Sequence, residues 1–170
     1  MSETKTNFEL VGDFHEIFGH PKPTVIDSNI FDSGSQLVNF RISLIEEELN
    51  ELKDGIKKKD IVEVTDALSD ILYVVYGMGQ ALGINLDKSF GLVHESNMTK
   101  LCKNEDEAKE TIEHYKTLDG FQNTDVRYRL SPDNTNYTIY NASNGKILKS
   151  KYFKLPCFDS VVGINSTAKQ

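Results

Sequence analysis

The sequence predicts an all-α protein with four or five helices and a small β-containing C-terminal appendage. Apolar residues recur at helical spacing through most of residues 11–118, which is the pattern of packed helices. After Gly120 the chain changes to short aromatic and β-branched segments that are separated by Pro-Asp-Asn and Asn-Gly turn signals. The length of 170 residues suits one compact domain. We expect residues 1–120 to form its helical core and residues 121–165 to form the appendage of the same domain.

The first predicted helix is short and amphipathic. Four residues stand at i, i+3, i+4 and i+7 and therefore share one helix face: Val11, Phe14, His15 and Phe18. The two prolines of "GHPKP" prevent this helix from continuing.

A longer second helix is expected at residues 35–56. Asp32 or Ser33 can cap its start, and Gly55 suits its end. Asp60 can then cap a third helix. A short connection between these two helices predicts an antiparallel pair.

The third helix carries an acidic stripe on an otherwise apolar surface. Glu63, Asp66 and Asp70 fall within an arc of about 60° on a helical wheel. Apolar side chains occupy nearly all the remaining circumference, which predicts a buried helix. Burial of an isolated charged carboxylate costs several kcal/mol. Asp66 and Asp70 should therefore have a partner that compensates their charge.

The second helix supplies further acids at Glu47, Glu48 and Glu51, which converge on one side. In an antiparallel pair the two acidic sets would face one cleft. Carboxylates at close range repel each other, and a hard divalent cation with oxygen ligands relieves this repulsion. The absence of His and Cys from the set favours Mg²⁺, or Mn²⁺ as its substitute, over zinc. The alternative is a solvated acidic face that nearby lysines balance.

Several other classes of protein are excluded by the composition and motifs. The net charge of −7 argues against sequence-independent binding of nucleic acid. The longest apolar run, residues 71–81, is too short to cross a membrane. The sequence contains no Glu-x-x-His motif of di-iron bundles and no phosphate-binding glycine loop. Cys102 and Cys157 lack metal-ligand spacing, so we expect free thiols in a cytoplasmic protein.

Besides the acidic helices, the segment "HESNMTKL" at residues 94–101 offers candidate functional residues. It lies in a fourth predicted helix that runs from residue 84 to residue 102. A fifth helix is expected at residues 104–118, and strands at 125–130, 136–141 and 146–153. The last six residues, "NSTAKQ", are expected to be disordered.

Four motifs together resemble one known superfamily. "EEELNE" at residues 46–51 and "EVTDALSDILYVVYG" at residues 63–77 are similar to the acidic motifs of the all-α nucleoside triphosphate pyrophosphohydrolases, which include the MazG-like and phosphoribosyl-ATP pyrophosphohydrolase-like proteins. "HESNMTKL" resembles the family's S-N-M-x-K segment, and "NGKILKSKYFKLP" at residues 144–156 resembles its G-K-x-x-K…P segment. In one respect the chain departs from many members, because Ala67 occupies a position where they have Glu.

The resemblance implies hydrolysis of a nucleoside triphosphate between its α- and β-phosphates, with deoxynucleotides such as dUTP or dCTP as first candidates. The metal ligands would be Glu48, Glu51, Asp66 and Asp70, with Glu63 as a further candidate and Glu47 as the general base. Two alternatives stay open, which are hydrolysis of phosphoribosyl-ATP and a non-catalytic helical interaction module.

Six further residues are candidates for substrate binding: His15, Arg41, Asn97, Lys100, Lys149 and Lys151. Each also has a structural alternative. His15 suits a hydrogen-bonded core position, Arg41 suits a buried counter-charge, and the other four suit a solvated surface. We expect a homodimer or a dimer of dimers, because a small helical unit of this kind leaves apolar faces for self-association.

Overall fold

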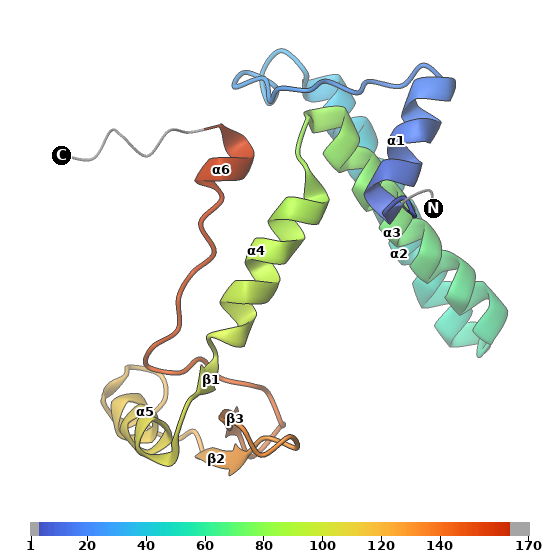
Figure 1. Cartoon of the computed structure of the whole chain (residues 1–170). Helices are drawn as coiled ribbons and strands as arrows, with labels where there is room; N and C mark the ends of the chain where they lie inside the picture. Colours follow the sequence, from blue (N-terminus) through green and yellow to red (C-terminus); the bar gives the residue numbers. More distant parts are fainter. Residues whose placement is uncertain (1–3, 164–170) are drawn as a thin grey trace. The chain divides into compact units, whose positions relative to one another are not determined.

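The computed structural model describes residues 4–163. The predicted tail disorder at residues 165–170 lies outside these residues, as does the end of the predicted appendage. The described chain is mostly helical with a small three-stranded sheet, so the predicted fold class is confirmed (Figure 1). It forms two compact units, which we describe separately. The first unit comprises residues up to Ser89 together with the segment from Phe158 onward, and the second comprises Phe90–Cys157.

Two long antiparallel helices form the frame of the first unit. They are α2 (Ser35–Lys58) and α3 (Ile61–Leu82), and Figure 1 shows them side by side. Lys59 adopts a left-handed conformation with φ 58°, which reverses the chain between them. Asp60 accepts hydrogen bonds from the backbone N–H groups of Val62 and Glu63, so its predicted role as the cap of α3 is confirmed.

Two predicted details of α2 are wrong. Its N-cap is Gly34, which offers no side-chain hydrogen bond, rather than Asp32 or Ser33. Gly55 lies inside the helix rather than at its end, because α2 continues to Lys58. A Cβ atom on Gly55 would stand 3.2 Å from the backbone nitrogen of Val64, so this glycine permits the close approach of α2 and α3.

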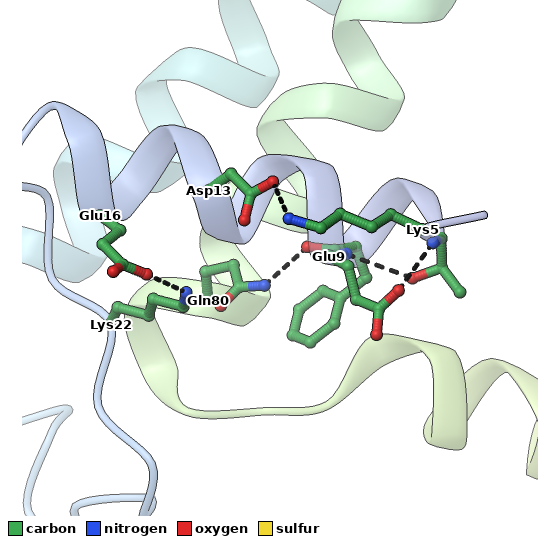
Figure 2. Close-up of polar contacts among 8 residues, drawn as sticks. Lys5, Glu9, Asp13, Glu16, Lys22 and Gln80 are labelled. Carbon is green, nitrogen blue, oxygen red and sulfur yellow. Dashed lines mark hydrogen bonds and ion pairs between the residues drawn. The ribbon is translucent and has the colours of Figure 1, made fainter. Parts of the chain in front are cut away.

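The short helix α1 (Asn7–Ile17) is fixed on α3 by hydrogen bonds. Thr6 and Glu9 form a capping box at its start. The buried side chain of Gln80 donates a hydrogen bond of 2.7 Å to the carbonyl oxygen of Phe8. Figure 2 shows these contacts together with two ion pairs that involve α1: Lys5–Asp13 and Lys22–Glu16. The position of His15 within the unit depends on this attachment.

The prediction that α3 is buried all round is wrong for a single copy of the chain. Ala67, Gly77 and Gln80 are buried on the covered side. Ile61 and Val62, however, are each 73% exposed. Only α1 and α2 make extensive contacts with α3 among the described elements, so they cover part of its circumference and leave apolar side chains in solvent.

The second unit combines one whole helix and part of another with an antiparallel sheet. Helix α4 (Leu86–Met98) reaches into this unit, and α5 (Glu105–Thr117) packs on the sheet. The strand order is β1-β3-β2, and the elements are β1 (Leu101–Cys102), β2 (Val126–Leu130) and β3 (Tyr137–Asn141). The buried core consists of Cys102, Ala108, Tyr115, Ile139 and Leu148. The short helix α6 (Asp159–Val162) belongs to the first unit.

Two predicted elements of the second unit are wrong. The fourth helix does not extend to Cys102, because α4 ends at Met98 and Leu101–Cys102 pair with β3. The predicted strand at residues 146–153 is reduced to an isolated bridge between Ile147 and Tyr140. Side chains of α5 bind its backbone instead, as the hydroxyl of Tyr115 does with Lys149.

The contacts also group α5 with the sheet, since its residues contribute to the core of the second unit. The division of the domain at residue 120 stays a prediction. Both cysteines are free, as predicted. No helix within residues 4–163 is by itself long and apolar enough to cross a membrane, and α3 and α4 meet the requirement only when this bent pair is counted together.

Candidate functional site

Acidic side chains of α2 and α3 gather around Glu48. Burial raises the pKa of Glu48, and the negative charges of Asp70, Glu51, Glu47 and Asp66 raise it further, in that order. The Oε2 atom of Glu48 is buried and has no hydrogen-bond partner. We call these five residues the acidic cluster. Charges from both helices, Glu47 and Glu51 of α2 and Asp66 and Asp70 of α3, therefore act on Glu48.

The members of the acidic cluster differ in their exposure. Glu48 and Asp70 are half-buried, whereas Glu47, Glu51 and Asp66 are exposed. The prediction that Asp66 is buried and therefore needs a partner for its charge is wrong, because its side of α3 is exposed. Within residues 4–163, no group of three His, Cys, Asp or Glu side chains is arranged to hold a metal ion.

Glu63 lies apart from this cluster, near the turn of the hairpin. Its carboxylate forms an ion pair of 2.8 Å with Lys58. It is not among the charges that raise the pKa of Glu48. Glu46 is exposed and is likewise absent from those charges, which makes it a natural control position.

The donor chemistry of the acidic cluster fits a hard divalent cation. All its donors are carboxylate oxygens, which Mg²⁺ and Mn²⁺ prefer. A buried carboxylate oxygen without a partner is costly, and a cation beside Glu48 would compensate both that oxygen and the mutual repulsion of its neighbours.

A second concentration of polar groups lies farther along the same two helices. Arg41 of α2 is only 5% exposed, and its Nε and Nη2 atoms are buried without hydrogen-bond partners. No carboxylate within residues 4–163 forms an ion pair with it, and burial lowers the pKa of its guanidinium. The described contacts of Arg41 therefore do not support a structural role as a buried counter-charge.

His15 of α1 lies close to this guanidinium. It is 1% exposed, and its Nδ1 atom lies 2.7 Å from the carbonyl oxygen of Pro21. A carbonyl only accepts hydrogen bonds, so Nδ1 carries the proton and Nε2 is an acceptor in the neutral ring. Burial lowers the pKa of His15, the bond to Pro21 partly opposes this effect, and the charge of Arg41 lowers the pKa further.

Arg41 and His15 line a cavity of about 290 Å³ between α1, α2 and α3. Aromatic and aliphatic side chains form most of its wall, and a Cβ atom on Gly77 would stand only 3.1 Å from Arg41 Nη1. We call it the Arg41 cavity. Its full lining is Val11, Phe14, His15, His20, Phe40, Arg41, Leu44, Tyr73, Val74 and Gly77.

The Arg41 cavity and the acidic cluster share one side of the helix pair. Arg41 precedes Glu48 by seven residues on α2, and Gly77 follows Asp70 by seven residues on α3. Seven residues are nearly two full turns, so each pair keeps almost the same facing and is separated by roughly 10 Å along its helix. Because the helices are antiparallel, both separations run in the same direction.

The other predicted substrate contacts belong to the second unit. Asn97 is exposed and Lys100 is half-buried near the end of α4. The ammonium group of Lys149 lies 4.6 Å from the ring centre of Phe153, and Lys151 pairs with Glu110 at 3.4 Å. The structure thus brings only His15 and Arg41 into the same unit as the acidic cluster.

Sequence reasoning missed the part that Gly77, Tyr73 and Phe40 take in lining the Arg41 cavity. One available signal was the glycine inside a helix that is otherwise apolar, since such a glycine often marks a close approach or a ligand. Tyr73 and Phe40 gave no comparable signal, because aromatic residues on a helix are ordinarily packing residues.

Comparison with known proteins gives two findings. The family model for phosphoribosyl-ATP pyrophosphohydrolase matches residues 11–97, a range that contains both the acidic cluster and the Arg41 cavity. An uncharacterized protein of Acanthamoeba polyphaga mimivirus is 38% identical, and the alignment covers 95% of this chain and 97% of the relative.

Proposed function

Because the chain belongs to the phosphoribosyl-ATP pyrophosphohydrolase family, we propose that it is a Mg²⁺-dependent enzyme that cleaves a nucleoside triphosphate into a monophosphate and pyrophosphate. The motifs in the sequence predicted this family, and that prediction is confirmed. The family itself makes the chain a pyrophosphohydrolase of the MazG-like kind. The observation that supports the proposal best is the buried, unpartnered Oε2 atom of Glu48 amid four other acids.

We assign the metal ligands to the acidic cluster. Glu48, Glu51, Asp66 and Asp70 would hold Mg²⁺, and Glu63 would join them only if it left Lys58. Bound there, Mg²⁺ or Mn²⁺ would supply positive charge to the phosphate oxygens and to the pyrophosphate that leaves. The raised pKa of Glu48 means that metal binding should release a proton at moderately acidic pH.

The remaining chemistry falls to side chains and water. Glu47, exposed beside Glu48, would accept a proton from a water molecule. The water oxygen forms a bond to the α-phosphorus, and the bond from this phosphorus to the α–β bridging oxygen breaks. Pyrophosphate departs with that oxygen. His15 and Arg41 would contact the rest of the nucleotide, and the roles of Asn97, Lys100, Lys149 and Lys151 in substrate binding stay proposals from the sequence.

A phosphate-release assay tests the proposal. A panel of ribo- and deoxyribonucleoside triphosphates is incubated with the full chain and Mg²⁺, with and without added inorganic pyrophosphatase. Colour should appear only when pyrophosphatase is present, because cleavage between α and β releases pyrophosphate. Direct release of orthophosphate would contradict the assigned bond.

The same panel separates the alternatives. The family's name points to phosphoribosyl-ATP, so this compound belongs in the panel. A strong preference for it would replace the triphosphate proposal. Inactivity on every compound with either metal would favour a non-catalytic interaction module.

Variants test the roles of the acids. Glu48→Gln, Glu51→Gln, Asp66→Asn and Asp70→Asn should each slow hydrolysis roughly a hundredfold or more, since each removes a proposed metal ligand. Glu46→Gln is the matched control and should retain the activity, because Glu46 is not among the charges that act on Glu48. An equal loss in Glu46→Gln would mean that the wrong helix face has been assigned.

We also propose that the protein is a homodimer or a dimer of dimers. Support comes from the large apolar side chains that the first unit exposes, such as Ile61, Val62 and Leu72. A single copy with such a surface would be expected to self-associate. Size-exclusion chromatography with light scattering should show a dimer or larger species, and a fully active monomer at low concentration would contradict the proposal.

A further inference from the structure

We propose that the Arg41 cavity is the pocket for the nucleobase and that it selects bases with a carbonyl group beside a ring N–H. Uracil, thymine, guanine and hypoxanthine have such a lactam edge, whereas adenine and cytosine do not. The proposal rests on the proposed function and deepens it, because it names the class of nucleotide that the acidic cluster would receive.

Burial of the Arg41 guanidinium has a cost in folding free energy. A buried guanidinium without a partner destabilises the fold, since it has lost the solvation of its charge and gained no acceptor. Its Nε and Nη2 atoms are in that condition. An arginine in this state is explained if a ligand supplies the missing acceptor, and the guanidinium lines a cavity of about 290 Å³ that a ligand can enter.

Arg41 and His15 offer a hydrogen-bond donor and an acceptor side by side. A Cβ atom on Gly77 would lie 3.1 Å from Arg41 Nη1 and 3.4 Å from His15 Nε2, so both nitrogens lie close to the same glycine in the cavity wall. Arg41 can only donate hydrogen bonds. Neutral His15 accepts at Nε2, because its Nδ1–H is directed to Pro21. A carbonyl beside an N–H matches this pair, and the edge of adenine offers no carbonyl.

The character of the cavity wall favours a nucleobase as the ligand. Phe14, Phe40 and Tyr73 contribute aromatic rings to the cavity, which suit the flat face of a base. The lining is mostly apolar, and a phosphate group with two negative charges would be poorly compensated there by one cation. The cavity is therefore better suited to the base than to the triphosphate.

The location of the Arg41 cavity relative to the acidic cluster also supports the proposal. The cavity lies roughly 10 Å from the acidic cluster along both α2 and α3, on the same side of the pair. A base in the cavity and phosphates at the cluster would place the sugar between them. One nucleotide can therefore occupy both places within the first unit.

The test begins with nucleosides, which lack phosphate and need no metal. The full chain is titrated with uridine, guanosine, inosine, cytidine and adenosine, and the amide signals of α1 and α3 are followed by NMR. The three lactam nucleosides should bind at least tenfold more tightly than cytidine and adenosine. Equal affinities, or no binding at all, would overturn the inference. This arm stays informative if the protein hydrolyses nothing.

Gly77→Ala tests the location of the pocket, and Gly91→Ala is its matched control. Both are glycines inside helices, but a Cβ atom on Gly91 would meet nothing within 4 Å. Gly77→Ala should weaken uridine binding at least tenfold, whereas Gly91→Ala should leave it unchanged. If hydrolysis occurs, Gly77→Ala should raise KM with kcat kept within about threefold. Unchanged uridine binding in Gly77→Ala would overturn the inference.

Arg41→Met keeps the length of the side chain and removes its charge. Its melting temperature should rise while uridine binding is lost, a combination that a structural arginine would not produce. A lower melting temperature would make Arg41 structural and overturn the inference. The affinity for inorganic triphosphate with Mg²⁺ should be the same in Gly77→Ala and the unmodified chain. Loss of this affinity in Gly77→Ala would instead assign the cavity to phosphate.

Discussion

The negative charge of Asp70 on α3 acts on Glu48 of α2 across the helix pair. After the burial of Glu48 itself, the charge of Asp70 is the largest cause of the raised pKa of Glu48. The two carboxylates come from helices that are separated by a turn at Lys59 and Asp60. From this proximity we predict a response of the acidic cluster to pH and to cations.

The first prediction concerns the pH dependence of stability without metal. The folded state raises the pKa of Glu48 above its ordinary value of 4.5, so folding favours the protonated form. The resulting stabilisation is complete below that value and is lost as pH rises through the pKa of the folded state. Asp70→Asn removes one cause of the shift. The variant should therefore gain in free energy of unfolding relative to the unmodified chain as pH rises toward neutral.

Urea denaturation at several pH values, with a chelator present, measures this difference. Glu46→Gln serves as the control, and its difference from the unmodified chain should not follow the same trend. If Asp70→Asn were less stable than the unmodified chain near neutral pH, Asp70 would instead have a structural role.

The second prediction concerns Mg²⁺. A cation that binds only the folded acidic cluster stabilises it by mass action, by about 2.7 kcal/mol at a hundred times its dissociation constant. Thermal unfolding of the unmodified chain should therefore shift upward with Mg²⁺. Glu48→Gln and Asp70→Asn should lose most of this shift, and Glu46→Gln should keep it. An equal response in all four proteins would place the cation elsewhere.

The third prediction concerns the attachment of α1. Gln80→Ala removes the hydrogen bond to Phe8 and leaves a gap, because Gln80 is 7% exposed. We expect a loss of about 1–3 kcal/mol in the free energy of unfolding. Gln36→Ala, at an exposed position of α2, should change it by less than about 0.5 kcal/mol. Equal effects of the two substitutions would show that the bond in Figure 2 contributes little.

The fourth prediction concerns the second unit. The Tyr115 hydroxyl donates to the carbonyl oxygen of Lys149 at 3.0 Å and accepts from its N–H group at 3.1 Å. Tyr115→Phe leaves both backbone groups without this partner, so we expect a loss of about 1–3 kcal/mol. Faster hydrogen exchange near Lys149 should accompany it. Tyr152→Phe, which loses an exposed bond to Glu110, should cost far less, and the reverse order would contradict the assignment.

The helices of the first unit could be predicted because their signals are local. The Asp60 side chain caps α3, and the prolines after α1 prevent the continuation of that helix, so both boundaries follow from adjacent residues. The ends of α2 were predicted less well. Lys59 takes the left-handed position that a glycine normally takes, and Gly55 serves the packing of α3 instead.

The second unit was harder to predict because non-local contacts override local preference there. Leu101 and Cys102 continue a helical pattern, yet they pair with β3, which lies more than thirty residues later. The segment after Asn144 has strand-like residues, yet its backbone N–H groups at Lys149 and Lys151 donate hydrogen bonds to hydroxyl groups of α5, and this part has an irregular form. In both cases, the residues of the segment do not themselves indicate the element with which it pairs.

The sequence by itself determined the helical frame, the family and the acids that face each other, since helical spacing and an antiparallel pair suffice to place them. Only the tertiary structure decided that Asp66 is exposed, that Glu63 pairs with Lys58 and that Arg41 is buried without an acceptor beside His15. The physical reason is that burial and pairing depend on which surfaces α1 and α2 cover, and a helical period specifies a face without specifying what lies against it.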